Sequence, residues 1–144
     1  NGTTTYEYDA NGQVTKVTDG NNQTIEYTWT KLGQKKSIKY PTRNSVSTAY
    51  TVSYTYDNNG NLTKVTDTNS GVTNYKYDAL NQVKTKNLPN GAESTYTYDK
   101  NGWLTQREET SNGASKQSYT YEYDKNGNRI KEIKVSSGIT ETTR

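Results

Sequence analysis

A short motif, Tyr-x-Tyr-Asp followed by a Gly three residues after the Asp, recurs along this chain of 144 residues. One copy reads Tyr-Thr-Tyr-Asp-Asn-Asn-Gly-Asn-Leu-Thr, from Tyr54 to Thr63. Tyr residues at alternate positions share one face of a β-strand, and Asp and Gly at these positions are typical of a tight turn. Each copy therefore predicts the end of one strand, a turn and the start of the next strand.

Six copies of the motif align, at intervals of 21 to 27 residues measured from Asp9 to Asp124. A period of this size is typical of repeat architectures. The second copy is degenerate, with Trp29 and Thr30, and in the fourth copy Asn81 replaces Gly. The residues expected to build the repeat are Tyr6, Tyr8, Asp9, Gly12, Tyr27, Trp29, Gly33, Tyr54, Tyr56, Asp57, Gly60, Tyr75, Tyr77, Asp78, Asn81, Tyr96, Tyr98, Asp99, Gly102, Tyr121, Tyr123, Asp124 and Gly127.

The predicted fold is all-β: tandem hairpins that form one curved, twisted antiparallel sheet. We interpret residues 1–144 as a single array of about six hairpin units, and as a fragment of a longer array. Six hairpins predict about twelve strands. The unpaired strand edges at the two ends of such a sheet favour pairing with another copy.

The strands after the turns are less regular. Val14, Leu62, Val83 and Leu104 lie two residues past the turn position, whereas Val17, Ile38 and Val65 lie five past it and have the wrong parity for a flat strand. We expect a bulge, or burial on both faces, to reconcile them. The sixth unit is irregular, because Arg129 occupies the aliphatic position and the apolar residues shift to Ile130 and Ile133.

Two intervals between motifs are longer than the others. The extra residues lie around Pro41–Ala49 and Thr110–Ser118, and we predict that both segments form longer hairpin loops. We call the turns that connect one motif hairpin to the next the far turns. The remaining far turns contain residues that favour turns, such as Asp19-Gly20 and Asn90-Gly91.

Composition excludes several classes of function. The chain has no Cys and no His, so disulfides, thiolate metal sites and imidazole catalysis are absent. No apolar run approaches the ~20 residues that span a bilayer, and we expect no signal peptide within these residues. The net charge of +3 comes from interspersed charges, which does not indicate a nucleic-acid surface. We assign no catalytic residue, metal site or cofactor, and we do not expect an enzyme.

The extended pattern Tyr-x-Tyr-Asp-x-x-Gly-x-Leu-Thr-x-x-x-Asp, nearly complete at Tyr6–Asp19 and Tyr54–Asp67, resembles the YD repeat of the RHS family. That family includes bacterial polymorphic toxins, wall-associated proteins of Gram-positive bacteria, the C component of insecticidal toxin complexes, and teneurins. The resemblance implies a spiral sheet that forms a hollow shell around a toxic C-terminal domain. It also implies export or surface display, in particular at a Gram-positive wall.

We therefore expect a non-enzymatic structural segment of a secreted or cell-surface protein, part of an encapsulating shell or scaffold for toxin delivery. Its partners would be further repeats and an enclosed domain of the parent chain, and other copies through open sheet edges. The alternative is a carbohydrate-binding module whose Tyr-rich face binds cell-surface or wall glycans. Trp103 is either an exposed contact or a packing residue. A third interpretation is assembly into open fibres.

Overall fold

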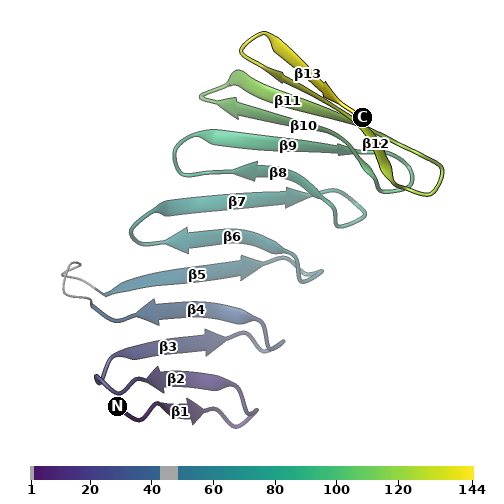
Figure 1. Ribbon diagram of the computed structural model, residues 1–144. Helices are drawn as coiled ribbons and strands as arrows, with labels where there is room; N and C mark the ends of the chain where they lie inside the picture. Colours follow the sequence, from purple (N-terminus) through teal and green to yellow (C-terminus); the bar gives the residue numbers. More distant parts are fainter. Residues whose placement is uncertain (1, 43–48) are drawn as a thin grey trace. The chain divides into compact units, whose positions relative to one another are not determined.

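The computed structural model describes residues 2–42 and 49–144. Within these residues the chain forms a single antiparallel sheet of thirteen strands whose order in the sheet follows the chain (Figure 1). The predicted all-β fold is confirmed. The strands are β1 (Thr5–Tyr8), β2 (Val14–Thr18), β3 (Thr24–Trp29), β4 (Lys35–Tyr40), β5 (Tyr50–Tyr56), β6 (Leu62–Asp67), β7 (Gly71–Tyr77), β8 (Val83–Asn87), β9 (Ala92–Tyr98), β10 (Leu104–Ser111), β11 (Ala114–Tyr123), β12 (Arg129–Ser136) and β13 (Ile139–Thr143).

The strands fall into two compact units, residues 1–72 and residues 73–144. In the first unit the motif turns join β1 to β2, β3 to β4 and β5 to β6, and in the second they join β7 to β8, β9 to β10 and β11 to β12. Each motif is therefore one β-hairpin.

Every motif hairpin contains a bulge at the second residue of the strand that follows its turn. In the first hairpin Tyr8 pairs with Val14 and Glu7 with Lys16, so Thr15 is the extra residue. Because the bulge restores the alternation, Val17 pairs with Tyr6 on the same face as Val14. The same shift occurs in the other five motif hairpins. A bulge thus reconciles the two sets of aliphatic residues.

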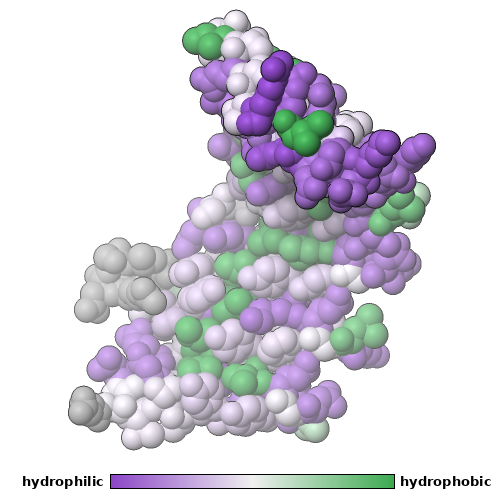
Figure 2. Space-filling model, turned by 45° about the vertical axis from the view of Figure 1, so that its right-hand side comes forward, coloured by the Kyte–Doolittle hydropathy of each residue, from purple (hydrophilic) through white to green (hydrophobic). Residues whose placement is uncertain are grey.

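The sheet has two chemically different faces. We call one of them the tyrosine face: it carries the two alternating aromatic residues of each motif. Aliphatic residues lie on the same face, and most of those in the first unit form a hydrophobic band in Figure 2. The polar face carries Thr, Ser and charged residues, including ion pairs between Lys16 and Glu7 (3.0 Å) and between Lys39 and Glu26 (3.2 Å).

The sheet is a single layer with almost no buried core. Among the described residues only Ile38 is buried, with 9% of its surface exposed. Tyr6 and Tyr8 remain 55% and 60% exposed. Most stabilisation must therefore come from neighbouring strands and turns, as in repeat proteins whose units contact only their neighbours.

The predicted long loop at Thr110–Ser118 is wrong. The extra residues lengthen β10 and β11, which are joined by a two-residue turn at Asn112 and Gly113. Both turn residues have positive φ, 51° and 77°, as a type I′ turn requires, and Asn-Gly is well suited to it. Because this turn is so tight, the extra residues enter the strand ladder. In the other predicted long loop, Pro41–Ala49, residues 43–48 lie outside the described residues.

The last hairpin was not predicted. Ser137 and Gly138 have φ values of 50° and 80°, and they join β12 to β13 with Ser136 paired to Ile139. No Tyr-x-Tyr-Asp precedes this turn, which is why the motif did not reveal it.

Candidate functional site

The turn of each motif is built around the Asp side chain. Asp9 Oδ1 accepts hydrogen bonds from the backbone N–H groups of Asn11 and Gln13, both at 2.9 Å. The carboxylates of Asp57, Asp78, Asp99 and Asp124 accept the equivalent pair of bonds. In the degenerate second copy, Thr30 Oγ1 accepts them at 3.3 and 3.2 Å. One oxygen of each turn carboxylate is therefore engaged by two backbone N–H groups.

The fourth residue of each turn has a left-handed backbone, which explains the preference for Gly or Asn. Its N–H donates to the backbone carbonyl at the Asp position, at 3.0 to 3.1 Å. The residues and their φ values are Gly12 (79°), Gly33 (77°), Gly60 (85°), Asn81 (61°), Gly102 (84°) and Gly127 (85°).

The second aromatic residue of a motif links consecutive hairpins. Tyr98 Oη donates to the Val83 carbonyl oxygen at 3.0 Å, and Val83 begins the return strand of the preceding motif. The equivalent bonds run from Trp29 Nε1 to Val14 O (2.9 Å), from Tyr56 Oη to Lys35 O (2.8 Å) and from Tyr123 Oη to Leu104 O (2.8 Å). We call this recurring bond the aromatic link.

The residue after the turn Gly makes a second connection between hairpins. Gln34 Nε2 donates to the Gly60 carbonyl oxygen at 3.0 Å, and Gln82 Nε2 donates to the Gly102 carbonyl oxygen at 3.1 Å. Trp103 occupies this position in the fifth motif. Its ring packs over Gly127, and it lies 5.4 Å from the ring of Tyr123. Trp103 is therefore a packing residue.

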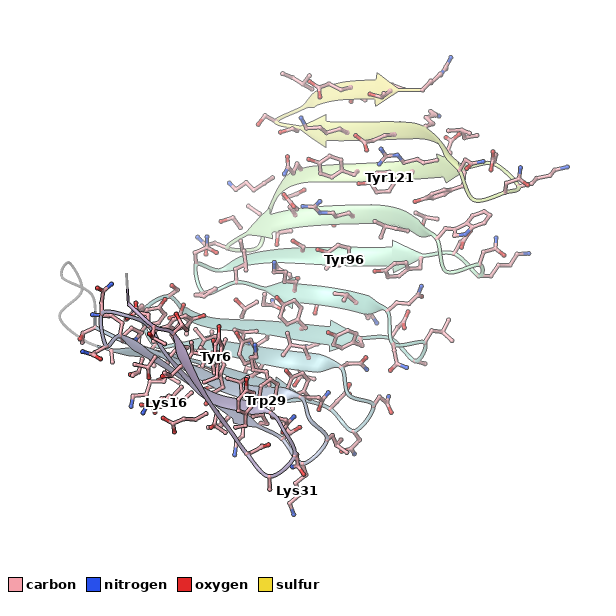
Figure 3. The ribbon with its side chains drawn as sticks, turned by 60° about the horizontal axis from the view of Figure 1, so that its bottom comes forward. Tyr6, Lys16, Trp29, Lys31, Tyr96 and Tyr121 are labelled. Carbon is pink, nitrogen blue, oxygen red and sulfur yellow. The ribbon has the colours of Figure 1, made fainter. Side chains whose placement is uncertain are left out.

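A shallow hollow of about 390 Å³ lies on the tyrosine face of the first unit. Aromatic rings of Tyr6, Tyr27 and Trp29 line it, with Gln13 and Lys35 as its polar groups. Figure 3 labels two of these residues, Tyr6 and Trp29. The Lys35 ammonium lies 5.1 Å from the Tyr27 ring centroid and 5.5 Å from that of Trp29, within cation–π range. The hollow combines flat apolar surfaces with hydrogen-bonding groups.

Sequence reasoning missed the role of Lys35. It lies two residues past Gly33, where most motifs have Val or Leu, and that departure was the available signal. Arg129 departs in the same way in the sixth motif, and its guanidinium lies 5.4 Å from the Tyr121 ring centroid. At both positions a cation covers an aromatic ring in place of an aliphatic side chain.

The tyrosine face of the second unit is charged where that of the first is apolar. Opposite the first Tyr of each motif, the first unit has Val17, Ile38 and Val65, whereas the second has Lys86, Arg107 and Glu132. Arg107 bonds to Glu109 and lies 5.4 Å from the Tyr119 ring centroid. Burial raises the pKa of Tyr121 on this face. The aromatic rings of this unit therefore pack against charged groups.

Two of the turn carboxylates have lowered pKa values, and the cause lies in the turn itself. Hydrogen bonds from the Asn61 side chain and from backbone N–H groups lower the pKa of Asp57, so this carboxyl stays ionised as an acceptor. Asp124 has a lowered pKa for the same reason, with Asn128 as its main partner. Within residues 2–42 and 49–144, no cluster of acidic side chains is suited to a metal ion. No helix in that part of the chain is long and apolar enough to cross a membrane.

The repeated hairpin, its Asp turn and its aromatic links define a class of tandem β-hairpin repeat. The chain matches the family described as RHS Repeat over residues 1–24, 8–45, 47–72 and 77–115. It belongs to the RHS repeat family. Repeat regions of this kind are structural and typically non-catalytic. A comparison with curated proteins found no match to this chain.

Several solved structures share the fold. A chain of the Photorhabdus luminescens Tc holotoxin pore matches with a TM-score of 0.62 and 16% identity, over 90% of this chain and 11% of that one. TcdB2-TccC3-TEV matches with a TM-score of 0.63 and 17% identity, over 96% and 11%. TcdB2-TccC3-Cdc42 matches with a TM-score of 0.56 and 17% identity, over 96% and 9%. This chain therefore spans about a tenth of the length of the chains that it matches.

Proposed function

We propose that this chain is a non-enzymatic structural segment of a larger RHS protein, forming part of an encapsulating shell or scaffold for toxin delivery. In this proposal residues 1–144 are one array of repeats within a longer array. The motif residues have structural roles only: the aromatic residues link hairpins, and Asp and Gly form the turns.

The aromatic link is the observation that carries the proposal. It uses the polar atom of the second motif aromatic, the group that a binding or catalytic site would otherwise use, to hold the backbone of the preceding hairpin. A bond of this kind extends a sheet one hairpin at a time. Repetition then produces a continuous wall, which is the requirement for a shell.

The matched structures support the context of the proposal. They are chains of a Tc holotoxin pore and of TcdB2-TccC3 assemblies, roughly ten times longer than this segment by the coverage that they share. We propose that the parent protein is exported or displayed at a surface, and that further repeats and an enclosed domain are its partners. Nothing in these matches favours a Gram-positive wall over another exported location.

The test is to remove one aromatic link without changing the packing. Tyr98→Phe removes the hydroxyl that bonds to Val83 and should lower the free energy of unfolding by about 1 kcal/mol. Tyr96→Phe is the control, because Tyr96 lies on the same strand and face and its hydroxyl makes no hydrogen bond within the described residues. Urea denaturation followed by circular dichroism measures both variants.

Loss of several aromatic links tests the proposed shell role in the parent protein. If the repeats enclose a domain, replacing Tyr56, Tyr98 and Tyr123 together by Phe should speed protease cleavage of that domain, whereas Tyr96→Phe should not. Equal stability of the Tyr98 and Tyr96 variants would contradict the structural role of the link. Unchanged protease protection would contradict the shell.

The hollow near Trp29 supports a second candidate, a glycan-binding module. Three aromatic rings with an amide and an ammonium at their margin offer stacking and hydrogen bonds to a sugar ring. If the chain is a glycan-binding module, glycan binding should be saturable and Tyr6→Ala should abolish it. Tyr96→Ala, on a strand distant from the hollow in the sequence, is the matched control and should retain binding. An absence of binding across a broad glycan panel would eliminate this candidate.

A further inference from the structure

Asn is followed directly by Gly at several turns of this chain. An Asn–Gly pair can deamidate spontaneously through a succinimide. The Gly backbone nitrogen attacks the Asn side-chain carbonyl carbon and loses its proton. A nitrogen–carbon bond forms, the bond to the amide nitrogen breaks, and ammonia leaves. Water then opens the resulting succinimide to Asp or isoaspartate. In the described residues the steps begin at Asn11, Asn59, Asn90, Asn101, Asn112 and Asn126.

At five of these six steps the attacking nitrogen is held in a hydrogen bond. In the motif turns the N–H of Gly12, Gly60, Gly102 and Gly127 donates to the carbonyl oxygen at the Asp position, at 3.0 to 3.1 Å. The Gly91 N–H donates to the Leu88 carbonyl oxygen at 3.1 Å. An N–H that donates a hydrogen bond is harder to deprotonate and is fixed in direction, so these five steps are protected.

The sixth step, Asn112–Gly113, differs in geometry. It forms the two-residue type I′ turn between β10 and β11, and both of its residues are exposed. Within the described residues the Gly113 N–H donates to no acceptor. No side chain or backbone atom outside its chain neighbours lies within 4 Å of a Cβ placed on Gly113, so the tip of the turn is open.

We propose that, among the Asn–Gly steps of the described residues, Asn112–Gly113 is the site where succinimide forms spontaneously, converting Asn112 to Asp or isoaspartate. The tip of the turn also contacts the preceding far turn. The Asn112 N–H donates to the Gly91 carbonyl oxygen at 3.2 Å, and Asn112 Oδ1 lies 2.5 Å from where a Cβ on residue 91 would be. Isoaspartate adds a carbon to the backbone of a two-residue turn. It therefore disrupts the type I′ geometry and this contact together.

The experiment is ageing of the intact chain at mildly alkaline pH, followed by peptide mapping with mass spectrometry. Asn112 should deamidate on the order of tenfold faster than Asn11, Asn59, Asn101 or Asn126, because those steps must first break a hydrogen bond. The same ageing in concentrated urea is the control. There the folded hydrogen bonds are absent, and the rates should converge.

Two outcomes would overturn the proposal. One is that a motif-turn Asn deamidates as fast as Asn112 in the folded chain. The other is that Asn112 remains the fastest by the same factor in urea, which would assign the preference to local sequence and not to the fold. An Asn112→Gln variant should lose the fast modification and leave the slow ones unchanged.

Discussion

At the scale of single residues, the turn Gly of four motifs lies beneath a side chain of the preceding motif. For Gly33, Gly60 and Gly102 the nearest atom to an added Cβ is a Gln Nε2, at 3.2 to 3.3 Å. For Gly127 it is the Trp103 ring, at 3.0 Å. The cost of replacing a turn Gly should therefore depend on what covers it, in addition to the cost of the left-handed backbone.

Gly127→Ala should be more destabilising than Gly12→Ala. Both residues have φ near 80°, so both variants lose about 1 kcal/mol from backbone strain. Nothing lies within 4 Å of a Cβ on Gly12, whereas the rigid indole of Trp103 must move at Gly127, which adds roughly 1 kcal/mol or more. Chemical denaturation of the two variants measures the difference.

A double mutant provides the control for Gly127. Trp103→Gln restores the flexible residue found at this position in other motifs, so Gly127→Ala in that background should cost about as much as Gly12→Ala. If the additional cost persists after Trp103 is replaced, packing of the indole on Gly127 is not its cause.

At the scale of elements, the unit of construction is a hairpin with a capped turn and a bulge. In the third and fifth motifs the bulge residue itself bonds across the hairpin: Thr63 Oγ1 donates to Thr55 O, and Thr105 Oγ1 donates to Thr97 O, both at 3.1 Å. In the sixth motif the bulge residue is Ile130, which has no such group and is 50% exposed. The irregularity seen in that unit is thus accommodated at the bulge.

The turn carboxylate gives the hairpins an acid-sensitive component. Because the Asn61 side chain bonds to its charged form, Asp57 has a pKa below its ordinary 3.8 in the folded chain. Its contribution to stability is therefore complete above that ordinary value and is lost as the pH falls through the lower folded-state pKa. Asp57→Asn should be less stable than the wild type at neutral pH, and the gap should narrow well below pH 3.8.

Urea denaturation at the two pH values measures this gap. Asp124→Asn offers an independent repeat of the experiment, since its carboxylate has the same kind of Asn partner, Asn128 Nδ2 at 2.8 Å. A gap of equal size at neutral and acidic pH would mean that the charge of the carboxylate does not stabilise the turn.

At the scale of the whole molecule, stability should be local. The described residues contain a single buried side chain, so no shared core couples distant hairpins. In such arrays each repeat is stabilised by its own contacts and by its immediate neighbours. A change in one hairpin should therefore affect the hairpins beside it and leave distant ones unaltered.

Hydrogen exchange can test this locality. Gly127→Ala should speed amide exchange in β11 and β12, which flank the altered turn, and leave the exchange of β3 and β4 unchanged. Peptide-level mass spectrometry on wild type and variant measures both regions. An equal loss of protection in β3 and β4 would show that the chain unfolds as one cooperative unit.

The sequence alone predicted the features that depend on neighbouring residues in the chain. Alternating Tyr residues predict strands, Asp and Gly three residues apart predict turns, and the mixed parity of Val14 and Val17 predicts either a bulge or burial on both faces, because these preferences arise within a few residues. The all-β fold and its family follow from repetition of that local pattern.

Tertiary structure decided what depends on pairing between segments. The extension of two strands through Thr110–Ser118 depends on ladder hydrogen bonds across β10 and β11, although Asn112-Gly113 is a local signal for the tight turn between them. Local pattern could not show that Tyr98 bonds to Val83, or that Lys35 covers Trp29, since each contact joins residues whose distance is set by strand register. Register is a property of the assembled sheet. It brings the polar atom of the second motif aromatic within hydrogen-bond distance of a backbone carbonyl oxygen in the preceding hairpin.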